Sequence, residues 1–354
     1  MFSGGSLAVA SSVYEAACED EKYHYTFVVS SNVFDVLPKR KSSVSIYVLD
    51  AVGLKSVLNL YRFKQIEKEA DPDLVFTLFG PTMWKPNTLH LVGFAWPHLV
   101  YGESPYFKNL SLKQRITSTL KIVTKRTLLK ANSDYIVTES ADVGRRLASK
   151  LGFENHRIFT VHNSVHQIFS QKNKWIYLDY SQSNRYMILM VSAYYPHKNF
   201  QLIPRILEEL NRSDVDIVTT IPQSKYDQLN TTGDKRWRNL GPVAIEELPG
   251  LYEQAESVLH TSLLECFSVS YLEAMYMKKA IVVPDLPFAR YVCGDAGLYY
   301  RANDPISAAT QIIYSIEKCD KQRLEIGKRR VDEYGLGQRR FREYTQIIKE
   351  LCKD

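Results

Sequence analysis

Short apolar runs alternate with longer amphipathic stretches along most of the chain. Apolar runs of about four to eight residues are typical of strands buried in a parallel sheet, and the stretches between them have the length of helices. In the first half, strands are predicted at 25–31, 44–50, 73–80, 90–95, 135–140 and 157–165. A polar stretch at about 170–184 interrupts this pattern, which then resumes with strands at 186–194, 215–221, 238–243, 257–263 and 280–286 and with helices near 199–210, 246–255 and 268–277.

The same alternation on both sides of the polar stretch predicts an α/β protein with two Rossmann-like, doubly wound domains that face each other across a cleft. We expect an N-terminal domain at 1–170, a C-terminal domain at 185–335 and a last helix at 336–354 that returns to the N-terminal domain. A doubly wound domain normally opens with a central strand, but Gly4 and Gly5 come with no strand before them. Either the natural beginning is missing, or the first sheet lacks a central strand.

Composition narrows the class of protein. With 45% hydrophobic and 24% charged residues, the 354-residue chain is a folded globular protein, not a disordered or fibrous one. The net charge of +6 suits an anionic ligand or an acidic lipid surface but is too weak for a nucleic-acid binder. The five scattered cysteines argue against a disulfide framework and for a reducing compartment. Because the chain has neither a secretion signal nor a bilayer-spanning apolar run, we expect a cytoplasmic protein, with peripheral attachment to the inner face of the membrane as an option.

That option comes from residues 108–130, which carry seven Lys or Arg and no acid. Within them, Leu112, Ile116, Leu120 and Val123 recur at helical spacing. The favoured interpretation is that this apolar stripe packs on the domain's own sheet while the cations face water. The alternative is a basic amphipathic helix that contacts an anionic membrane.

The segment ECFSVSYLEAM, residues 265–275, holds the strongest candidate chemistry. Glu265 precedes a tight polar turn (Ser268, Val269, Ser270), and Glu273 lies eight positions later on the helix that follows. A helix N-terminus offers unpaired N–H groups and a positive dipole end, which together bind phosphate. The two carboxylates could then bind the groups on either side of that phosphate. The competing interpretation is two surface glutamates beside an amphipathic helix.

This segment resembles the E-x7-E motif of family 4 retaining glycosyltransferases of group 1, which have the GT-B fold. The surrounding sequence, from GPVAIEELPGLY through LLECFSVSYLEAM to AIVVPDL, follows the family's pattern almost position by position. Upstream, MVSAYYPHKNF, YIVTESADVGRRLASKLG and VHNSVHQIF also resemble family elements. The resemblance covers about 130–345 well and the first 130 residues loosely.

The resemblance implies a role for each matching residue. Lys198 would clamp the donor diphosphate, Glu265 would lie near the donor sugar, and Glu273 would bind the ribose. It also implies backbone contacts to the phosphate from Ser268 and Val269, main-chain contacts to the nucleobase from Gly241, Pro242 and Val243, and an approach to the diphosphate from the N-terminal domain by Gly4 and Gly5. His98 is either a catalytic-site histidine or a structural one.

Two departures from the family pattern affect the donor site. The family's arginine five residues before the lysine is replaced by Ala193, so that a phosphate-binding cation is absent or supplied elsewhere, for instance by His197. The turn reads C-F-S-V-S where the family has G-F-G-L-P. Both changes bear on donor details more than on the class of enzyme.

The activity implied is retaining transfer of a sugar, of hexosyltransferase type (EC 2.4), from a nucleotide diphosphate sugar to a glycan or lipid-linked acceptor. From family habit, the process would be synthesis of a bacterial surface polysaccharide such as O-antigen, lipopolysaccharide or capsule. No cofactor and no metal are expected, since the Asp71/Asp73 and Asp214/Asp216 pairs read as turns before strands. The alternatives are an epimerase or hydrolase of nucleotide sugars with the same fold, and a non-catalytic nucleotide-sugar binding protein.

Overall fold

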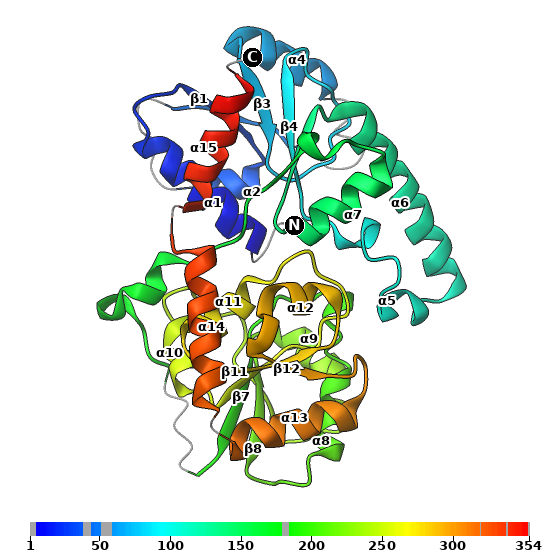
Figure 1. Ribbon diagram of the computed structural model, residues 1–354, viewed down its shortest axis with the longest axis vertical. Coiled ribbons are helices and arrows are strands. Elements are labelled where there is room, and N and C mark those ends of the chain that lie inside the picture. The colour runs from blue at the N-terminus through cyan, green and yellow to red at the C-terminus, as the bar shows by residue number, and fades with distance from the viewer. Residues whose placement is uncertain are drawn as a thin grey trace. The chain divides into compact units, whose positions relative to one another are not determined.

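The computed structural model describes residues 5–37, 44–50, 59–178, 184–318, 320–337 and 339–352. Contacts between residues divide the chain into two compact units (Figure 1). The first unit contains residues 1–100, 112–162 and 338–354, and the second contains 101–111 and 163–337. Within the described residues, no helix is both long enough and apolar enough to cross a bilayer.

The first unit has parallel strands flanked by helices. Its main sheet has the order β3-β4-β5-β6 and consists of β3 (Leu74–Thr77), β4 (Leu89–Phe94), β5 (Tyr135–Thr138) and β6 (Ile158–Thr160). Its helices are α1 (Gly5–Glu19), α2 (Ser31–Phe34), α4 (Leu60–Ala70), α6 (Leu112–Asn132), α7 (Ala141–Leu151) and α15 (Arg339–Leu351). α15 places Tyr344, Ile347 and Leu351 against Leu91 and Val137 of the sheet. The last helix therefore packs on the N-terminal unit.

The remaining strands of the first unit form a separate sheet. β1 (Tyr25–Val29) and β2 (Val44–Val48) pair in parallel with each other, and within the described residues neither pairs with β3. Among the described strands the first unit thus has two separate sheets, and whether a central strand is missing stays open. Within the main sheet, the absence of a side chain at Gly93 of β4 allows the segment after β3 to lie close to that strand, because a Cβ there would lie 2.0 Å from the Leu78 carbonyl oxygen.

The second unit contains one parallel sheet of six strands in the order β12-β11-β10-β7-β8-β9. The strands are β7 (Tyr186–Met190), β8 (Val215–Thr219), β9 (Trp237–Asn239), β10 (Ser257–Leu259), β11 (Ala280–Pro284) and β12 (Gly297–Tyr300). The chain starts at β7, builds outward through β8 to β9, and then returns to the other side of β7 with β10. The strand order therefore reverses between β7 and β10, as in a Rossmann-like domain.

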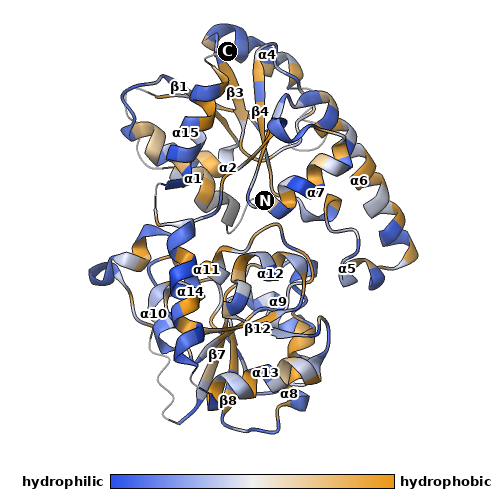
Figure 2. Ribbon diagram, viewed as in Figure 1, coloured by the Kyte–Doolittle hydropathy of each residue, from blue (hydrophilic) through white to orange (hydrophobic). Residues whose placement is uncertain are grey.

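Helices cover both faces of this sheet (Figure 1). They are α8 (Leu202–Glu209), α9 (Gln223–Leu229), α10 (Leu248–Gln254), α11 (Val269–Tyr276), α12 (Pro287–Cys293), α13 (Pro305–Glu317) and α14 (Lys321–Tyr334). α8 and α13 share a buried core with β7, β8 and β11, in which Ile188, Ile206 and Ile312 are fully covered. Figure 2 shows the corresponding apolar colouring of the strands.

The units begin and end at residues other than those expected for the domains. The first unit stops at His162, before the expected boundary at 170. Residues 101–111, which include α5 (Pro105–Lys108), pack with the second unit, where the Ser104 hydroxyl donates a hydrogen bond to the Leu263 carbonyl. The segment 163–170, which sequence assigned to the first domain, also belongs to the second unit.

Candidate functional site

Two loops at the reversal point of the second sheet bring candidate residues together. Lys198 ends the short turn η5 (Pro196–Lys198) after β7, and Glu265 lies in the loop after β10. Ligands of doubly wound sheets bind at the carboxyl ends of the strands where the order reverses. The Thr261 hydroxyl donates to the Lys198 carbonyl over 2.6 Å, and the Leu263 N–H donates to the His197 carbonyl over 2.8 Å. These bonds tie the two loops to each other.

The Lys198 ammonium donates a short hydrogen bond to Glu265 Oε1. Only 15% of the Lys198 side chain and 10% of the Glu265 side chain are exposed, so that water screens this ion pair weakly. Asn199 follows in the left-handed region, with φ of 56°, which asparagine adopts more readily than most residues. It is buried, and its amide donates to Asn303 over 3.3 Å. The backbone that carries the lysine is therefore held in place.

α11 begins directly after this loop. Ser268 is the residue before its first turn, and its hydroxyl lies 2.9 Å from the Ser270 hydroxyl. The first N–H groups of a helix have no partner within the helix and lie at its positive end. A cation and a helix start thus belong to the same pair of linked loops, an arrangement that can bind an anion such as a diphosphate. The structure locates Ser268 and Val269 at this helix start, as the sequence predicts.

Glu273 also lies on α11, but its partner is Tyr252 of α10, whose hydroxyl donates to the carboxylate over 2.9 Å. Burial raises the pKa of Glu273 to about 7, and the hydrogen bond from Tyr252 opposes this shift. Burial, followed by the charge of Glu273, raises the pKa of Tyr252 well above its usual value. Glu273 is thus a carboxyl group that changes charge near neutral pH, at the same helix as the anion-binding start but paired with neither Lys198 nor Glu265.

Two histidines lie near Lys198. The ring of His197 stacks on Tyr195, with centroids 5.5 Å apart, and burial lowers its pKa. His260, in the loop after β10, is buried with its ring edge against Tyr271, and its Nε2 finds no partner among the described residues. Burial, with a smaller effect of Lys198, lowers the pKa of His260 to about 3, so that its ring stays neutral. A neutral imidazole beside the lysine leaves Lys198 as the cation of this pair of loops.

Sequence reasoning missed three residues that position the site: Tyr252, His260 and Thr261. Tyr252 ends the stretch GPVAIEELPGLY, and the other two residues lie in SVLHTSLLE, which ends at Glu265. Polar residues at the end of an apolar strand are a signal for the edge where sites form. That signal could have found His260 and Thr261, whereas the Tyr252 contact depends on tertiary packing.

The other predicted residues lie further along the chain or in the first unit. Gly241, Pro242 and Val243 follow the edge strand β9, and Gly241 has a φ of 76°. His98 lies in a turn of the first unit, stacked on Trp96 with centroids 5.1 Å apart. Gly5 is the first residue of α1, and Gly4 lies outside the described residues. Ala193 lies between β7 and η5, where the family pattern has arginine.

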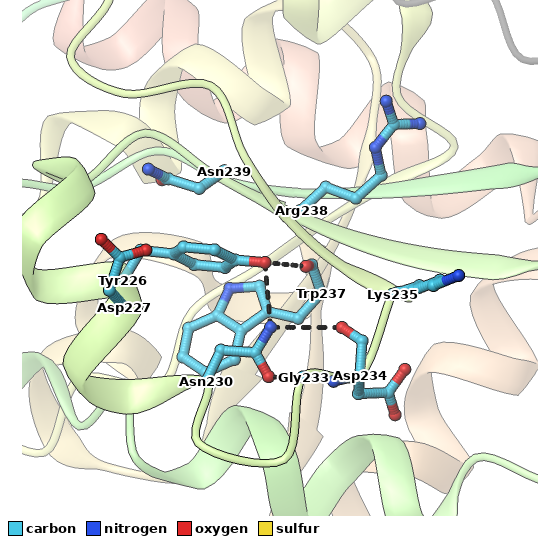
Figure 3. Close-up of a pocket in the computed structure, with 9 residues that line it drawn as sticks. All are labelled: Tyr226, Asp227, Asn230, Gly233, Asp234, Lys235, Trp237, Arg238 and Asn239. Carbon is cyan, nitrogen blue, oxygen red and sulfur yellow. Dashed lines mark hydrogen bonds between the residues drawn. The ribbon is translucent and has the colours of Figure 1, made fainter.

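A surface hollow of about 530 Å³ lies elsewhere in the second unit (Figure 3). It is lined by α9 and by the segment leading into β9, where the Tyr226 hydroxyl donates to the Trp237 carbonyl and accepts from Asn230. It contains none of the predicted site residues.

Neither Asp-x-Asp pair forms part of a metal-binding cluster. In the part of the chain that the structure describes, no group of three His, Cys, Asp or Glu side chains could hold a metal ion. Asp216 forms a bidentate ion pair with Arg185, and Asp214 forms one with Arg212. The carboxylates of the second Asp-x-Asp pair are thus bound by arginine.

Comparison with known proteins finds a family match in the second unit. Residues 185–318, which include Lys198, Glu265 and Glu273, match the family model described as Glycosyl transferases group 1. At the level of sequence, no curated protein matches the chain.

Among solved structures, the chain is similar to a glycosyltransferase from Rickettsia africae, with a TM-score of 0.74 and 17% identity over 100% of this chain and 97% of that one. It is also similar to HepE of Anabaena in complex with UDP and glucose (TM-score 0.69, 14% identity, 98% of this chain and 96% of that one). A third similar structure is WaaG, a glycosyltransferase involved in lipopolysaccharide biosynthesis (TM-score 0.72, 12% identity, 98% and 97%).

The fold is therefore GT-B, with two Rossmann-like units. The family match covers residues 185–318 of the second unit, and the neighbours show the fold of the whole chain.

Proposed function

We propose that the chain is a retaining glycosyltransferase that moves a sugar from a nucleotide diphosphate to an acceptor hydroxyl. The observation that carries this proposal is the largely buried pair of Lys198 and Glu265 beside the start of α11. A cation and a helix start offer two sources of positive potential to a pyrophosphate. Glu265 is then adjacent to the sugar on one side of that pyrophosphate, and Glu273 is the candidate for the ribose on the other.

In the proposed reaction, the bond between the anomeric carbon and the phosphate oxygen breaks, and the acceptor oxygen bonds to the carbon on the same face. The proton of the acceptor hydroxyl goes to the departing phosphate. Lys198 and the first N–H groups of α11 stabilise the negative charge that develops on the leaving group, which lowers the barrier more than it tightens substrate binding. In this reaction Glu265 stabilises the oxocarbenium-like centre.

We further propose that the acceptor is a glycan or a lipid-linked sugar, in synthesis of a bacterial surface polysaccharide such as lipopolysaccharide. The similarity to WaaG, which is involved in lipopolysaccharide biosynthesis, supports this direction, and the complex of HepE with UDP supports a nucleotide-linked donor. The free cysteines Cys18, Cys266, Cys293 and Cys352 support a reducing compartment such as the cytoplasm.

The test combines donor binding with transfer. UDP-, GDP- and dTDP-sugars are screened for thermal stabilisation, and the donor that binds is then used for product analysis with and without a chelator. We expect Lys198→Ala to lower turnover by roughly a hundredfold to a thousandfold, the range for losing one stabiliser of developing charge. Lys172→Ala is the matched control, because Lys172 pairs with Glu253 on the surface of the same unit.

Stabilisation by none of the donors would contradict the proposal, as would a Lys198→Ala variant with the turnover of the control. Loss of turnover in the presence of the chelator would contradict metal independence alone. Sugar release or epimerisation without any acceptor would assign the site to a hydrolase or an epimerase.

The second candidate, a non-catalytic nucleotide-sugar binder, is favoured by Ala193, which removes a phosphate-binding cation of the family pattern. For such a protein, donor binding persists in Glu265→Gln and no acceptor yields a product. A glycosyltransferase loses transfer in the same variant while the donor still stabilises the fold.

A further inference from the structure

The outward side of α6 carries an exposed apolar stripe. Leu112, Ile116, Leu120 and Val123 are exposed by 76%, 55%, 62% and 56%. Their spacing of three and four residues places them on one line along the helix. The expectation that this stripe packs on the domain's own sheet is therefore wrong.

The opposite side of α6 is the one that packs on the first unit. Leu129 is fully buried, and the Lys125 ammonium lies 4.2 Å from the centre of the Trp96 ring. Burial lowers the pKa of Lys125. Sequence periodicity detected the apolar stripe and assigned it to the core. The core contact is instead made by the side of α6 that carries Leu129 and Lys125, where Lys125 covers the Trp96 ring. Residues 112–117 are exposed around the whole helix.

Cations flank the exposed stripe, and no acid lies on the helix. At 100° per residue, Lys113 lies on one side of the stripe, Arg126 lies on the other, and Lys130 continues the line at the C-terminal end. All three are exposed. Figure 2 shows apolar and polar residues interspersed along α6. A protein partner for an apolar stripe would have to be acidic along both edges, whereas an anionic bilayer surface offers apolar depth and negative charge together.

We propose that α6 docks the protein on an anionic membrane surface, with the stripe inserted between headgroups and the flanking cations against lipid phosphates. The helix spans 21 residues, about 32 Å at 1.5 Å per residue, and lies parallel to the membrane plane. Docking is a property of the first unit and does not depend on the proposed transfer reaction. It would keep the protein beside any acceptor that is carried on a lipid.

The test is flotation of the full chain with vesicles of phosphatidylcholine alone or of equal parts phosphatidylcholine and phosphatidylglycerol. We expect binding to the anionic vesicles that weakens with salt, and at least about tenfold weaker binding to the neutral ones. The triple variant Lys113→Gln, Arg126→Gln, Lys130→Gln should lower the partition coefficient roughly a hundredfold, since each cation near such a surface contributes about fivefold. The control replaces Arg62, Lys64 and Lys68, which are exposed on α4, and should bind as the unchanged chain does.

The apolar stripe is tested separately. Leu112→Ser with Ile116→Ser should abolish flotation, while Tyr61→Ser with Ile306→Ser, at residues of similar exposure, should not. Circular dichroism verifies that both variants fold. Equal flotation of the stripe variant and its control would overturn the proposal. So would dimers that form without lipid and dissociate in the stripe variant, because the stripe would then be an interface between copies.

Discussion

Replacing Glu273 with glutamine should flatten the pH dependence of the protein's stability. The Glu273 carboxyl, on α11, is buried and accepts a hydrogen bond from the Tyr252 hydroxyl. Burial raises its pKa from 4.5 to about 7. Below pH 4.5 the group is protonated in both the folded and the unfolded chain and has no differential effect. Between these two pKa values the unfolded chain ionises while the folded one keeps its proton, so that the free energy of unfolding falls as pH rises.

The size of the effect follows from that interval. At about 1.4 kcal/mol per pH unit, the interval from 4.5 to about 7 costs about 3 kcal/mol of unfolding free energy, and the loss is complete once the folded carboxyl also ionises. Glutamine can still accept the hydrogen bond from Tyr252 but does not titrate. We therefore expect the variant to match the unchanged protein at about pH 4 and to exceed it by about 3 kcal/mol at about pH 8.

The assay is urea unfolding across this pH range, followed by tryptophan fluorescence, because Trp237 is buried in the same unit. Glu256→Gln, at an exposed carboxyl of that unit, controls for the loss of a charge. Tyr252→Phe removes the hydrogen bond that opposes the shift, so the free energy of unfolding should go on falling to a higher pH. If Glu273→Gln and Glu256→Gln kept the same pH dependence as the unchanged protein, the assignment of the titrating group would be refuted.

Three further substitutions have defined outcomes. Gly93→Ala should destabilise the first unit by about 2–4 kcal/mol in urea unfolding, because its Cβ would overlap a backbone carbonyl just after β3. Arg340→Met should cost about 3–5 kcal/mol, since it removes a buried guanidinium that lies 3.2 Å from the Glu139 carboxylate; an unchanged midpoint would contradict this. Thr261→Val should weaken donor binding about fivefold to tenfold in calorimetry without loss of stability above about 1.5 kcal/mol, because the hydroxyl holds the carbonyl of Lys198.

Local pattern predicted the fold, whereas the resemblance to group 1 glycosyltransferases singled out Lys198 and Glu265. Apolar runs placed five of the six strands of the second sheet to within a few residues, and the loops after β7 and β10 followed from them. The sixth strand, β12, was not predicted. Once those two strands are adjacent, Lys198 and Glu265 come together by topology alone.

What the sequence could not give depends on packing between distant segments. The hydrogen bond of Tyr252 to Glu273 joins two helices, and the pKa that results depends on burial, which no spacing reveals. The prediction that the stripe on α6 packs on the domain's own sheet was wrong for a related reason. An apolar line predicts an apolar environment but does not say whether the protein's own core or another surface supplies it. The cations that flank the stripe are visible in the sequence, and they indicate better than the apolar line which surface the stripe contacts.

The Tyr101–Ser111 segment restricts how the protein can be divided for experiments. It lies far from residue 163 in sequence, yet it packs with the second unit, where Tyr101 contacts Phe288 edge-on at 5.9 Å and Ser104 bonds to the Leu263 carbonyl. A fragment that starts at 163 would expose the surface beneath this segment and release the loop that leads to Glu265. An isolated second unit would therefore need 101–111 supplied as a peptide or grafted through a linker.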